Sequence, residues 1–271
     1  MSSSANDAGG LFDVSGRRVV VTGGTAGIGL AAAAHLVAHG AQVVIGGRRS
    51  DGEGIADRIG ATFISMDVTD EDSTRRAFER VAELFEQIDA LILNAGVNLE
   101  HGEIESLDAA VFEQVFEVNT LGVARALRHG ITAVRDGGSV IVTSSPAGSV
   151  AVSGMAAYAG SKAAVDHLVR VWAMELGPRQ VRVNAVLPGI VETEMTDLAG
   201  SAPTIEIIRR LTAGGIVRQA HEMAPVFHFL VSDASASLTG SLVGCHDGIS
   251  AGLSRAVMAS VAALSTEVAS G

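Results

Sequence analysis

The sequence predicts a single α/β domain built on a doubly wound parallel sheet with helices on both faces. Two observations indicate this fold. Strand-like and helix-like segments alternate along the 271 residues without a long linker, and apolar residues make up 48% of the chain while aromatic residues make up only 4%. A core of Val, Ile, Leu and Ala is typical of parallel strands that helices cover on both sides. The length suits one domain with a sizeable core.

The elements follow one another in a regular order. Short runs of β-branched and apolar residues predict strands at residues 18–22, 42–46, 61–66, 89–93, 138–143, 181–186 and 242–246. Longer segments with apolar residues at helical spacing predict helices at residues 28–39, 52–59, 71–86, 107–129, 154–176, 204–212 and 221–231. In such a sheet, ligands bind at the carboxyl ends of the strands.

The first predicted strand leads directly into a glycine-rich turn. Gly23 can adopt the positive φ of a sharp turn, Gly27 lets the backbone approach a phosphate, and Gly29 lets the next helix pack closely on the strand. The start of that helix offers unpaired N–H groups and the positive end of its dipole to a pyrophosphate. The turn therefore predicts a dinucleotide site, with an ordinary glycine turn as the alternative.

Tyr158 and Lys162 stand four residues apart, so one helical turn brings them onto the same face, and Ser145 lies 13 residues upstream. A tyrosine ordinarily has a pKa of about 10. A cation at roughly 4 Å, with an effective dielectric near 20, would stabilise the phenolate by about 4 kcal/mol. Such a tyrosine could exchange protons with a substrate near neutral pH. A simple ion pair on a helix surface is the alternative.

Several motifs occur in an order and spacing that resemble the short-chain dehydrogenase/reductase family. They are Thr22-Gly23-x-x-x-Gly27-Ile28-Gly29, Asn94-Ala95-Gly96, Asn119, Ser145, Tyr158-x-x-x-Lys162 and Pro188-Gly189-Ile190-Val191-Glu192-Thr193. Together they span roughly residues 12 to 250. The resemblance implies a Rossmann-type fold and an oxidoreductase. Such an enzyme transfers a hydride between a nicotinamide coenzyme and a ketone or secondary alcohol, here expected to be a hydrophobic small molecule.

The resemblance also implies a role for each catalytic residue. Ser145 would hydrogen-bond the substrate oxygen, Tyr158 would transfer the proton, and Lys162 would lower the pKa of Tyr158 and bind the nicotinamide ribose. Asn119 would bend its helix and hold a water in a proton relay. The adjacent Ser144 is expected to be structural, because successive residues at a strand end point to opposite faces.

The coenzyme contacts implied by the resemblance are Gly23, Thr25, Gly27, Ile28, Gly29, Arg48, Asp67, Val68, Asn94, Ala95, Gly96, Tyr158, Lys162, Pro188, Gly189, Val191 and Thr193. NADP(H) is favoured. Gly47 stands where NAD-specific relatives carry an acidic residue, and Arg48 can bind a 2′-phosphate through its planar fork. NAD(H) is possible, because Ala26 stands where many NADP-using relatives carry a second basic residue. Asp67 could instead belong to a helix-entry turn, and Arg48 could be a solvated charge.

The motifs divide the chain into three parts. Residues 11–252 form the dinucleotide-binding and catalytic domain, and residues 1–10, which are polar and contain glycine, are expected to be disordered. Residues 253–271 form a C-terminal extension that can become a helix used for packing or subunit contact. The resemblance implies a homo-oligomer, a tetramer whose subunits pair through the helices at 107–129 and 154–176.

Charge and cysteine content limit the partners and the location. A net charge of −11 disfavours nucleic acid and anionic membranes. One cysteine, Cys245, and no signal-peptide pattern at the start indicate a cytoplasmic protein. No metal site is expected, and His35 and His39 are given no chemistry. Two other function classes stay open. A cofactor-free lyase of this fold would carry arginine in place of Lys162 and lack the glycines, whereas a non-catalytic protein would bind nucleotide without turnover.

Overall fold

A computed structural model describes residues 8–99, 102–199 and 210–270. Its main feature is a seven-stranded, wholly parallel sheet in the order β3-β2-β1-β4-β5-β6-β9. The strands are β1 (Arg18–Thr22), β2 (Gln42–Gly47), β3 (Thr62–Ser65), β4 (Ile88–Leu93), β5 (Val134–Thr143), β6 (Arg182–Pro188) and β9 (Leu242–Cys245). The predicted doubly wound parallel sheet is therefore confirmed, and β5 begins four residues before the predicted strand.

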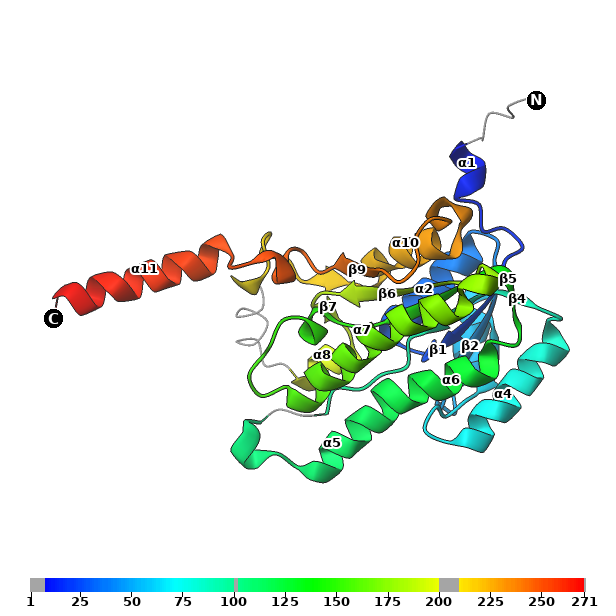
Figure 1. Cartoon of the computed structure of the whole chain (residues 1–271), viewed down its shortest axis with the longest axis horizontal. Coiled ribbons are helices and arrows are strands. Elements are labelled where there is room, and N and C mark those ends of the chain that lie inside the picture. The colour runs from blue at the N-terminus through cyan, green and yellow to red at the C-terminus, as the bar shows by residue number, and fades with distance from the viewer. Residues whose placement is uncertain (1–7, 100–101, 200–209, 271) are drawn as a thin grey trace.

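Helices cover both faces of this sheet (Figure 1). One face carries α2 (Gly27–Ala38), α3 (Gly52–Ile59) and α10 (Ala220–Val231); the other carries α4 (Glu71–Leu84), α5 (Ala109–Phe116), α6 (Gly122–Gly130) and α7 (Ala156–Leu176). The central strands supply both cores in alternation. Val20 packs in the core that contains Phe78, whereas Val19 packs in the core that contains Phe227. Side chains buried on both sides explain the continuous apolar runs.

The order of the strands reverses between β1 and β4. The chain builds β1, β2 and β3 outward, then returns so that β4 pairs with β1 on its other side, with Val19 opposite Ala90. The loops that leave the two central strands therefore run in opposite directions. They leave a crevice at the carboxyl ends, which is where an open α/β sheet binds its ligand.

The helix predicted at residues 107–129 is present at residues 109–130, and it contains a π-helical turn that was not predicted. The structure has α5, then a π-helical turn at Glu117–Leu121, then α6, and the N–H of Gly122 donates to the carbonyl of Glu117. The wider turn contains Asn119, whose side chain bonds to the loop at Val97. A π-bulge accommodates an extra residue in a helix and often occurs at functional sites.

The segment after β6 forms small elements over the carboxyl edge of the sheet. β7 (Val191–Glu192) pairs with β8 (Arg218–Gln219) in a separate two-stranded sheet, and α8 (Glu194–Ala199) follows β7. The predicted helix at residues 204–212 falls largely on residues 200–209, which lie outside the described residues, while residues 210 and 211 are helical.

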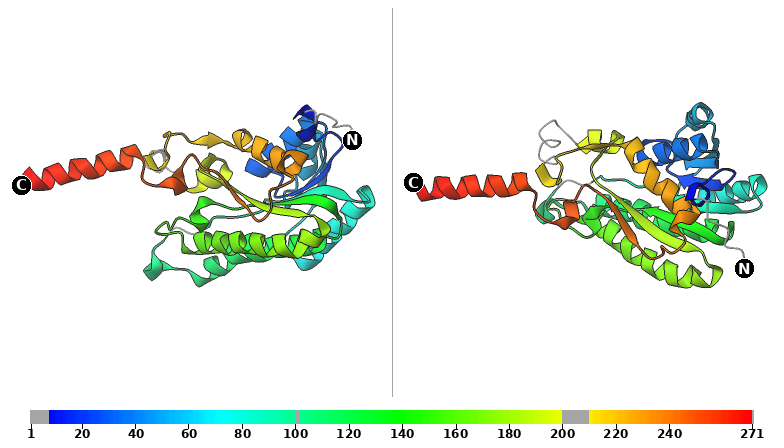
Figure 2. Two further views of the ribbon diagram at one scale, coloured as in Figure 1. Left: turned by 45° about the horizontal axis from the view of Figure 1, so that its top comes forward. Right: turned by 90° about the horizontal axis from the view of Figure 1, so that it is seen from above.

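Both ends of the described chain are helical. Residues 8–10, within the segment predicted to be disordered, belong to the short helix α1 (Ala8–Leu11); residues 1–7 lie outside the described residues. The C-terminal extension forms α11 (Arg255–Ser270), which runs away from the domain in every view (Figures 1 and 2). Leu253 and Met258 are 72% and 51% exposed, so neither packs into the domain. Contact with another subunit stays a prediction.

Across the described parts of the chain, no helix combines the length and apolar character that crossing a membrane requires.

Candidate active site

A cleft of about 1570 Å³ opens at the carboxyl edge of the sheet, at the reversal between β1 and β4. Most of the predicted site residues line it: Gly23, Thr25, Gly27, Ile28, Arg48, Asp67, Val68, Asn94, Ala95, Gly96, Ser145, Tyr158, Lys162, Pro188, Gly189, Val191 and Thr193. Two predicted residues, Gly29 and Asn119, lie behind its wall instead of lining it. The motifs that are dispersed in sequence therefore surround one cavity.

Tyr158, Ser145 and Lys162 lie together in this cleft. Tyr158 and Lys162 occupy successive turns of α7, and Nζ of Lys162 lies 5.8 Å from the centre of the Tyr158 ring. The Ser145 hydroxyl, just beyond the end of β5, lies close enough to the Tyr158 phenol to influence its pKa. The backbone N–H of Ala147 donates to Ser145 Oγ at 3.2 Å, which fixes the position of that hydroxyl. A substrate oxygen can therefore be bound by two adjacent hydroxyl groups.

Burial governs the pKa values of this group. Desolvation raises the pKa of Tyr158, and the nearby Ser145 hydroxyl opposes the rise. Desolvation lowers the pKa of Lys162 to about 8, and the charge of Asp166 opposes that fall. The direction for Tyr158 is opposite to the one expected from sequence. Lys162 is 4% exposed, and its charge is not among the causes that shift the pKa of Tyr158.

The Asn119 side chain holds the helix against the cleft wall. It is fully buried, and its Oδ1 accepts from the N–H of Val97 at 2.8 Å. Its Nδ2 donates to the Val97 carbonyl at 2.9 Å and to Ser161 Oγ at 3.1 Å. Ser161 Oγ in turn donates to the Tyr158 carbonyl at 2.7 Å. Asn119 thus connects the π-helical turn to α7, and the water-holding role stays a prediction.

The glycine turn is required by close backbone packing. Gly23 has φ +64°, and a Cβ there would lie 2.8 Å from the Cα of Ala95. A Cβ on Gly29 would lie 2.4 Å from Nδ2 of Asn94. That amide donates to the Gly23 carbonyl at 3.1 Å, so the Asn94 side chain is used to hold the turn closed. Any contact of Asn94 with a coenzyme is therefore expected through its backbone.

The start of α2 fits the phosphates of a dinucleotide. The N-cap residue, Ala26, is extended and has no side chain that could accept from the first N–H groups of the helix. Gly23, Ala26, Gly27 and Ile28 line the cleft at this point. Unpaired N–H groups, the positive end of the helix dipole and a backbone open to close approach make this a suitable anion site.

Two arginines follow β2, and the structure separates their roles. Arg49 forms a two-point contact with Asp51, at 3.0 and 3.2 Å, and a weaker one with Glu194. Arg48 is 65% exposed and only approaches Asp67, at 3.8 Å. Burial raises the pKa of Asp67, but hydrogen bonds from Thr69 and the charge of Arg48 lower it overall, so the carboxylate is ionised at neutral pH. Arg48 is therefore the arginine free to turn toward a phosphate.

Sequence reasoning missed two residues that act on Lys162, one through a hydrogen bond and one through its charge. The Thr143 carbonyl accepts from Nζ of Lys162 at 2.9 Å. Asp166 is 4% exposed and lies one turn after Lys162 on α7; burial raises its pKa, while Ser144, Arg170 and Lys162 oppose the rise. The four-residue spacing of Lys162 and Asp166 was a usable signal for the second residue. A backbone carbonyl carries no sequence signal, so the first could not be found.

Many of the residues that line the cleft are apolar. They include Val97, Leu99, Val150, Val152, Met155, Met195, Leu211 and Ile249. Among the described lining residues, the cations are Arg48 and Arg49, which follow β2, and Lys162, which is buried. The carboxylate of Glu103 also lines the cleft. This apolar lining suits a neutral, hydrophobic molecule better than an anion.

The fold and the cleft define a dinucleotide-binding α/β protein. The chain matches a family model described as Enoyl-(Acyl carrier protein) reductase over residues 23–250. It is 32% identical to cis-4-hydroxycyclohexanecarboxylate dehydrogenase of Sinomonas cyclohexanicum over 242 residues, covering 87% of this chain and 97% of the relative. It is 31% identical to 2,5-dichloro-2,5-cyclohexadiene-1,4-diol dehydrogenase of Sphingobium indicum over 252 residues, covering 89% and 100%.

The fold of the chain is also similar to that of a solved structure. A short-chain type dehydrogenase/reductase from Mycobacterium marinum superposes with a TM-score of 0.84 at 31% identity, covering 89% of this chain and 98% of that one. The chain belongs to the short-chain dehydrogenase/reductase family. Oxidoreductase activity with a nicotinamide coenzyme follows from this membership.

Proposed function

We propose that this protein interconverts a neutral, hydrophobic secondary alcohol and its ketone, with NADP(H) as the preferred coenzyme. The observation that carries the proposal is the placement of the Tyr158 phenol beside Ser145 and Lys162 in a cleft with many apolar lining residues. The names of the two relatives describe hydroxyl groups on six-membered carbon rings. A ring-bearing substrate is therefore our first choice.

The chain's own groups would orient the substrate and move a proton. A bound nicotinamide would supply or accept the hydride at the carbon that bears the oxygen. Ser145 would hydrogen-bond that oxygen, and Tyr158 would donate its proton during reduction or accept one during oxidation. The apolar wall would keep competing water away. The glycine turn and the start of α2 would hold the pyrophosphate, and Thr193 with the backbone at Val191 would hold the carboxamide.

The coenzyme preference is supported by the two arginines after β2. Gly47 contributes no carboxylate, and Arg48 is exposed and weakly paired, whereas Arg49 is already held by Asp51. A 2′-phosphate would replace a single 3.8 Å contact with charge-assisted hydrogen bonds. The neighbouring Asp67 carboxylate would limit the gain, so we expect discrimination to be modest.

We also propose a homotetramer in the cytoplasm. The assembly is supported by apolar residues exposed on α7, and the location by the single cysteine, Cys245.

A substrate panel with both coenzymes tests the proposed function. Neutral ring ketones, such as substituted cyclohexanones, should be reduced with a higher kcat/KM than the matching ketones that carry a carboxylate. NADPH should support a higher rate than NADH for each of them. Faster turnover of the carboxylates would contradict the neutral substrate, and stoichiometric coenzyme binding without turnover of any ketone or alcohol would indicate a non-catalytic nucleotide-binding protein.

A further inference from the structure

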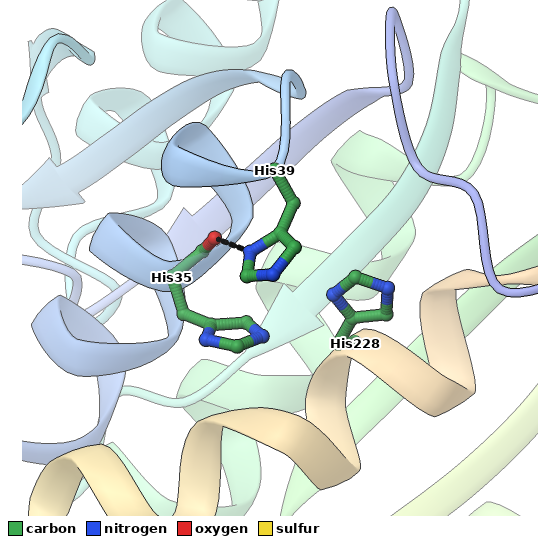
Figure 3. A group of neighbouring side chains, drawn as sticks. All are labelled: His35, His39 and His228. Atoms are coloured by element: carbon green, nitrogen blue, oxygen red, sulfur yellow. Dashed lines mark hydrogen bonds between the residues drawn. The ribbon is translucent and has the colours of Figure 1, made fainter.

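Three histidines that are far apart in sequence meet at the edge of the sheet opposite the cleft (Figure 3). His35 and His39 lie at the end of α2, and His228 lies in the last turn of α10. The helix α2 begins at Gly27 beside the cleft and rises about 1.5 Å per residue, so His39 lies about 18 Å from the glycine turn. The cluster is therefore separate from the candidate active site.

The three imidazoles face one another closely enough to share one ion. One ring nitrogen from each lies within 4.8 Å of the other two. The ring centres of His35 and His39 are 4.2 Å apart, and those of His39 and His228 are 4.9 Å apart. His39 follows His35 by four positions, one helical turn, which places both side chains on the same face of the helix. Tetrahedral zinc has Zn–N bonds of about 2.0 Å, so its ligand nitrogens are about 3.3 Å apart. The rings would have to move closer together to bind one ion.

In two of the rings, one nitrogen is hydrogen-bonded to a backbone carbonyl, as is usual for histidines that bind a metal. Nδ1 of His39 is 2.7 Å from the His35 carbonyl, and Nε2 of His228 is 2.7 Å from the Phe12 carbonyl. A carbonyl only accepts, so each of these nitrogens carries the proton and the other nitrogen of a neutral ring keeps its lone pair. A second hydrogen bond to a backbone carbonyl is the arrangement that orients histidine ligands toward a metal.

One of the remaining lone pairs is both buried and unused. His228 is only 9% exposed, and its Nδ1 has no hydrogen-bond partner among the residues that the structure describes. A buried nitrogen without a partner costs the folded protein free energy. Nδ1 is the nitrogen left for the cluster once Nε2 is bound to Phe12. A metal ion would satisfy it.

The surrounding charge favours a cation. The carboxyl ends of α2 and α10 both point at the cluster, and each carries the partial negative charge of its helix dipole. Asp13 adds a carboxylate close enough for its charge to interact with His228. A surface hollow lined by Phe12, Asp13, Ser15, His39 and His228 gives an ion access from solvent.

We propose that His35, His39 and His228 bind a divalent transition-metal ion, with Zn²⁺ as the first choice and water at the open fourth position. The ion would join the end of α2, the end of α10 and the segment at Phe12. Its role would be structural, because the site lies far from the cleft. No chemical role could be assigned to His35 and His39 from the sequence. The third histidine, His228, joins them only because α10 packs beside α2.

Metal binding to the full chain, prepared without a polyhistidine tag and dialysed against EDTA, tests the proposal. Calorimetric titration with ZnCl₂ should show one Zn²⁺ bound per chain, and the unfolding temperature should rise with Zn²⁺ but not with Mg²⁺, which prefers oxygen ligands. Co²⁺ bound at the same site should give the visible absorbance of nitrogen-ligated, tetrahedral cobalt. Absence of binding, or a Mg²⁺ effect equal to that of Zn²⁺, would overturn the proposal.

Variants identify the site. His228→Gln and His39→Gln should each weaken Zn²⁺ binding by about tenfold or more. His39 is exposed, so His39→Gln keeps the test valid even if His228→Gln fails to fold. His167→Gln, an exposed histidine on α7, is the matched control and should bind Zn²⁺ as the wild type does. Turnover without Zn²⁺ should be unchanged in His39→Gln. Equal weakening in all variants, including the control, would place the metal elsewhere.

Discussion

The Thr143 carbonyl accepts a hydrogen bond from Nζ of Lys162 at 2.9 Å. Thr143 is the last residue of β5, so α7 is tied to the carboxyl edge of the sheet through Lys162. The hydroxyl of the same threonine donates to Asn94 Oδ1 at 3.0 Å, and Asn94 holds the glycine turn. One residue therefore connects Lys162 to the glycine turn, through its carbonyl on one side and its hydroxyl on the other.

Tyr158→Phe should lower kcat/KM by at least about 100-fold, because it removes the transferable proton and keeps the ring. Coenzyme binding should persist, because the glycine turn is unchanged. Tyr158 is the only tyrosine in the chain, so ultraviolet absorbance against pH reports its phenol directly, with Tyr158→Phe as the blank. We expect a pKa above the ordinary 10, since desolvation dominates. Near wild-type turnover by the variant would refute the assignment of Tyr158 as the proton donor.

Lys162→Met should reduce activity and yet stabilise the protein at neutral pH. Burial lowers the pKa of Lys162 from 10.5 to about 8, so the unfolded chain binds more protons between these values and stability rises with pH across that window. Below pH 8 the buried charge costs on the order of 3 kcal/mol, which methionine does not incur. The unfolding temperature should therefore rise at pH 7 and approach that of the wild type above pH 10. Parallel losses of stability and activity would assign Lys162 a structural role instead.

Asp166→Asn should also stabilise the protein at neutral pH. Burial raises the pKa of Asp166 above 3.8, so wild-type stability falls as pH rises from that value through the folded pKa. Asparagine has nearly the same volume but does not ionise, so the variant does not lose stability in this way as the pH rises. It also removes the charge that raises the pKa of Lys162, which should then titrate below 8. Thermal unfolding against pH measures the first effect. An unfolding temperature at pH 7 below that of the wild type would show that the carboxylate is favourably paired.

The fold and most of the site could be predicted because each depends on short sequence patterns, namely apolar strands and the motifs that follow them. Strands buried on both faces are apolar throughout, and the carboxyl ends of neighbouring strands meet at one edge, so the motifs had to converge. The π-turn at Asn119 was missed, because helical periodicity does not show one inserted residue. The pKa direction of Tyr158 was wrong, because the sequence argument included the charge of Lys162 and omitted desolvation. The histidine cluster needed His228, which only tertiary packing supplies.

The exposed apolar residues on α7 predict how subunits pair. Met174 is 81% exposed and Val171 is 38% exposed on the helix that the family resemblance assigns to the interface. A charge in the core of an interface is strongly disfavoured. Met174→Lys should therefore shift the tetramer to smaller species in light scattering at micromolar concentration. Leu84→Lys, at an exposed position on α4, is the control and should leave the tetramer intact. A wild-type monomer with full activity would contradict the proposed assembly.

Coenzyme preference depends on the end of β2. Arg48→Ala should raise the KM for NADPH far more than that for NADH, because it removes the exposed guanidinium proposed to bind the 2′-phosphate. Arg49→Ala is the matched control and should change the ratio little, since Asp51 already holds that side chain. The KM values for both coenzymes, measured with one ketone, decide the outcome. A higher kcat/KM with NADH than with NADPH in the wild type would disprove the NADP(H) preference and leave the fold and mechanism unaffected.

The reverse change requires a steric control. Gly47→Asp should favour NADH, because a carboxylate there can accept from both ribose hydroxyls and repels a 2′-phosphate. A Cβ at this position would lie 2.8 Å from Oγ1 and 2.9 Å from Cγ2 of Thr25, so that side chain must move in any substitution. Gly47→Ala introduces the same Cβ without the charge. The preference for NADH should therefore appear in Gly47→Asp and not in Gly47→Ala, and equal behaviour of the two variants would show that crowding of Thr25, not charge, controls the choice.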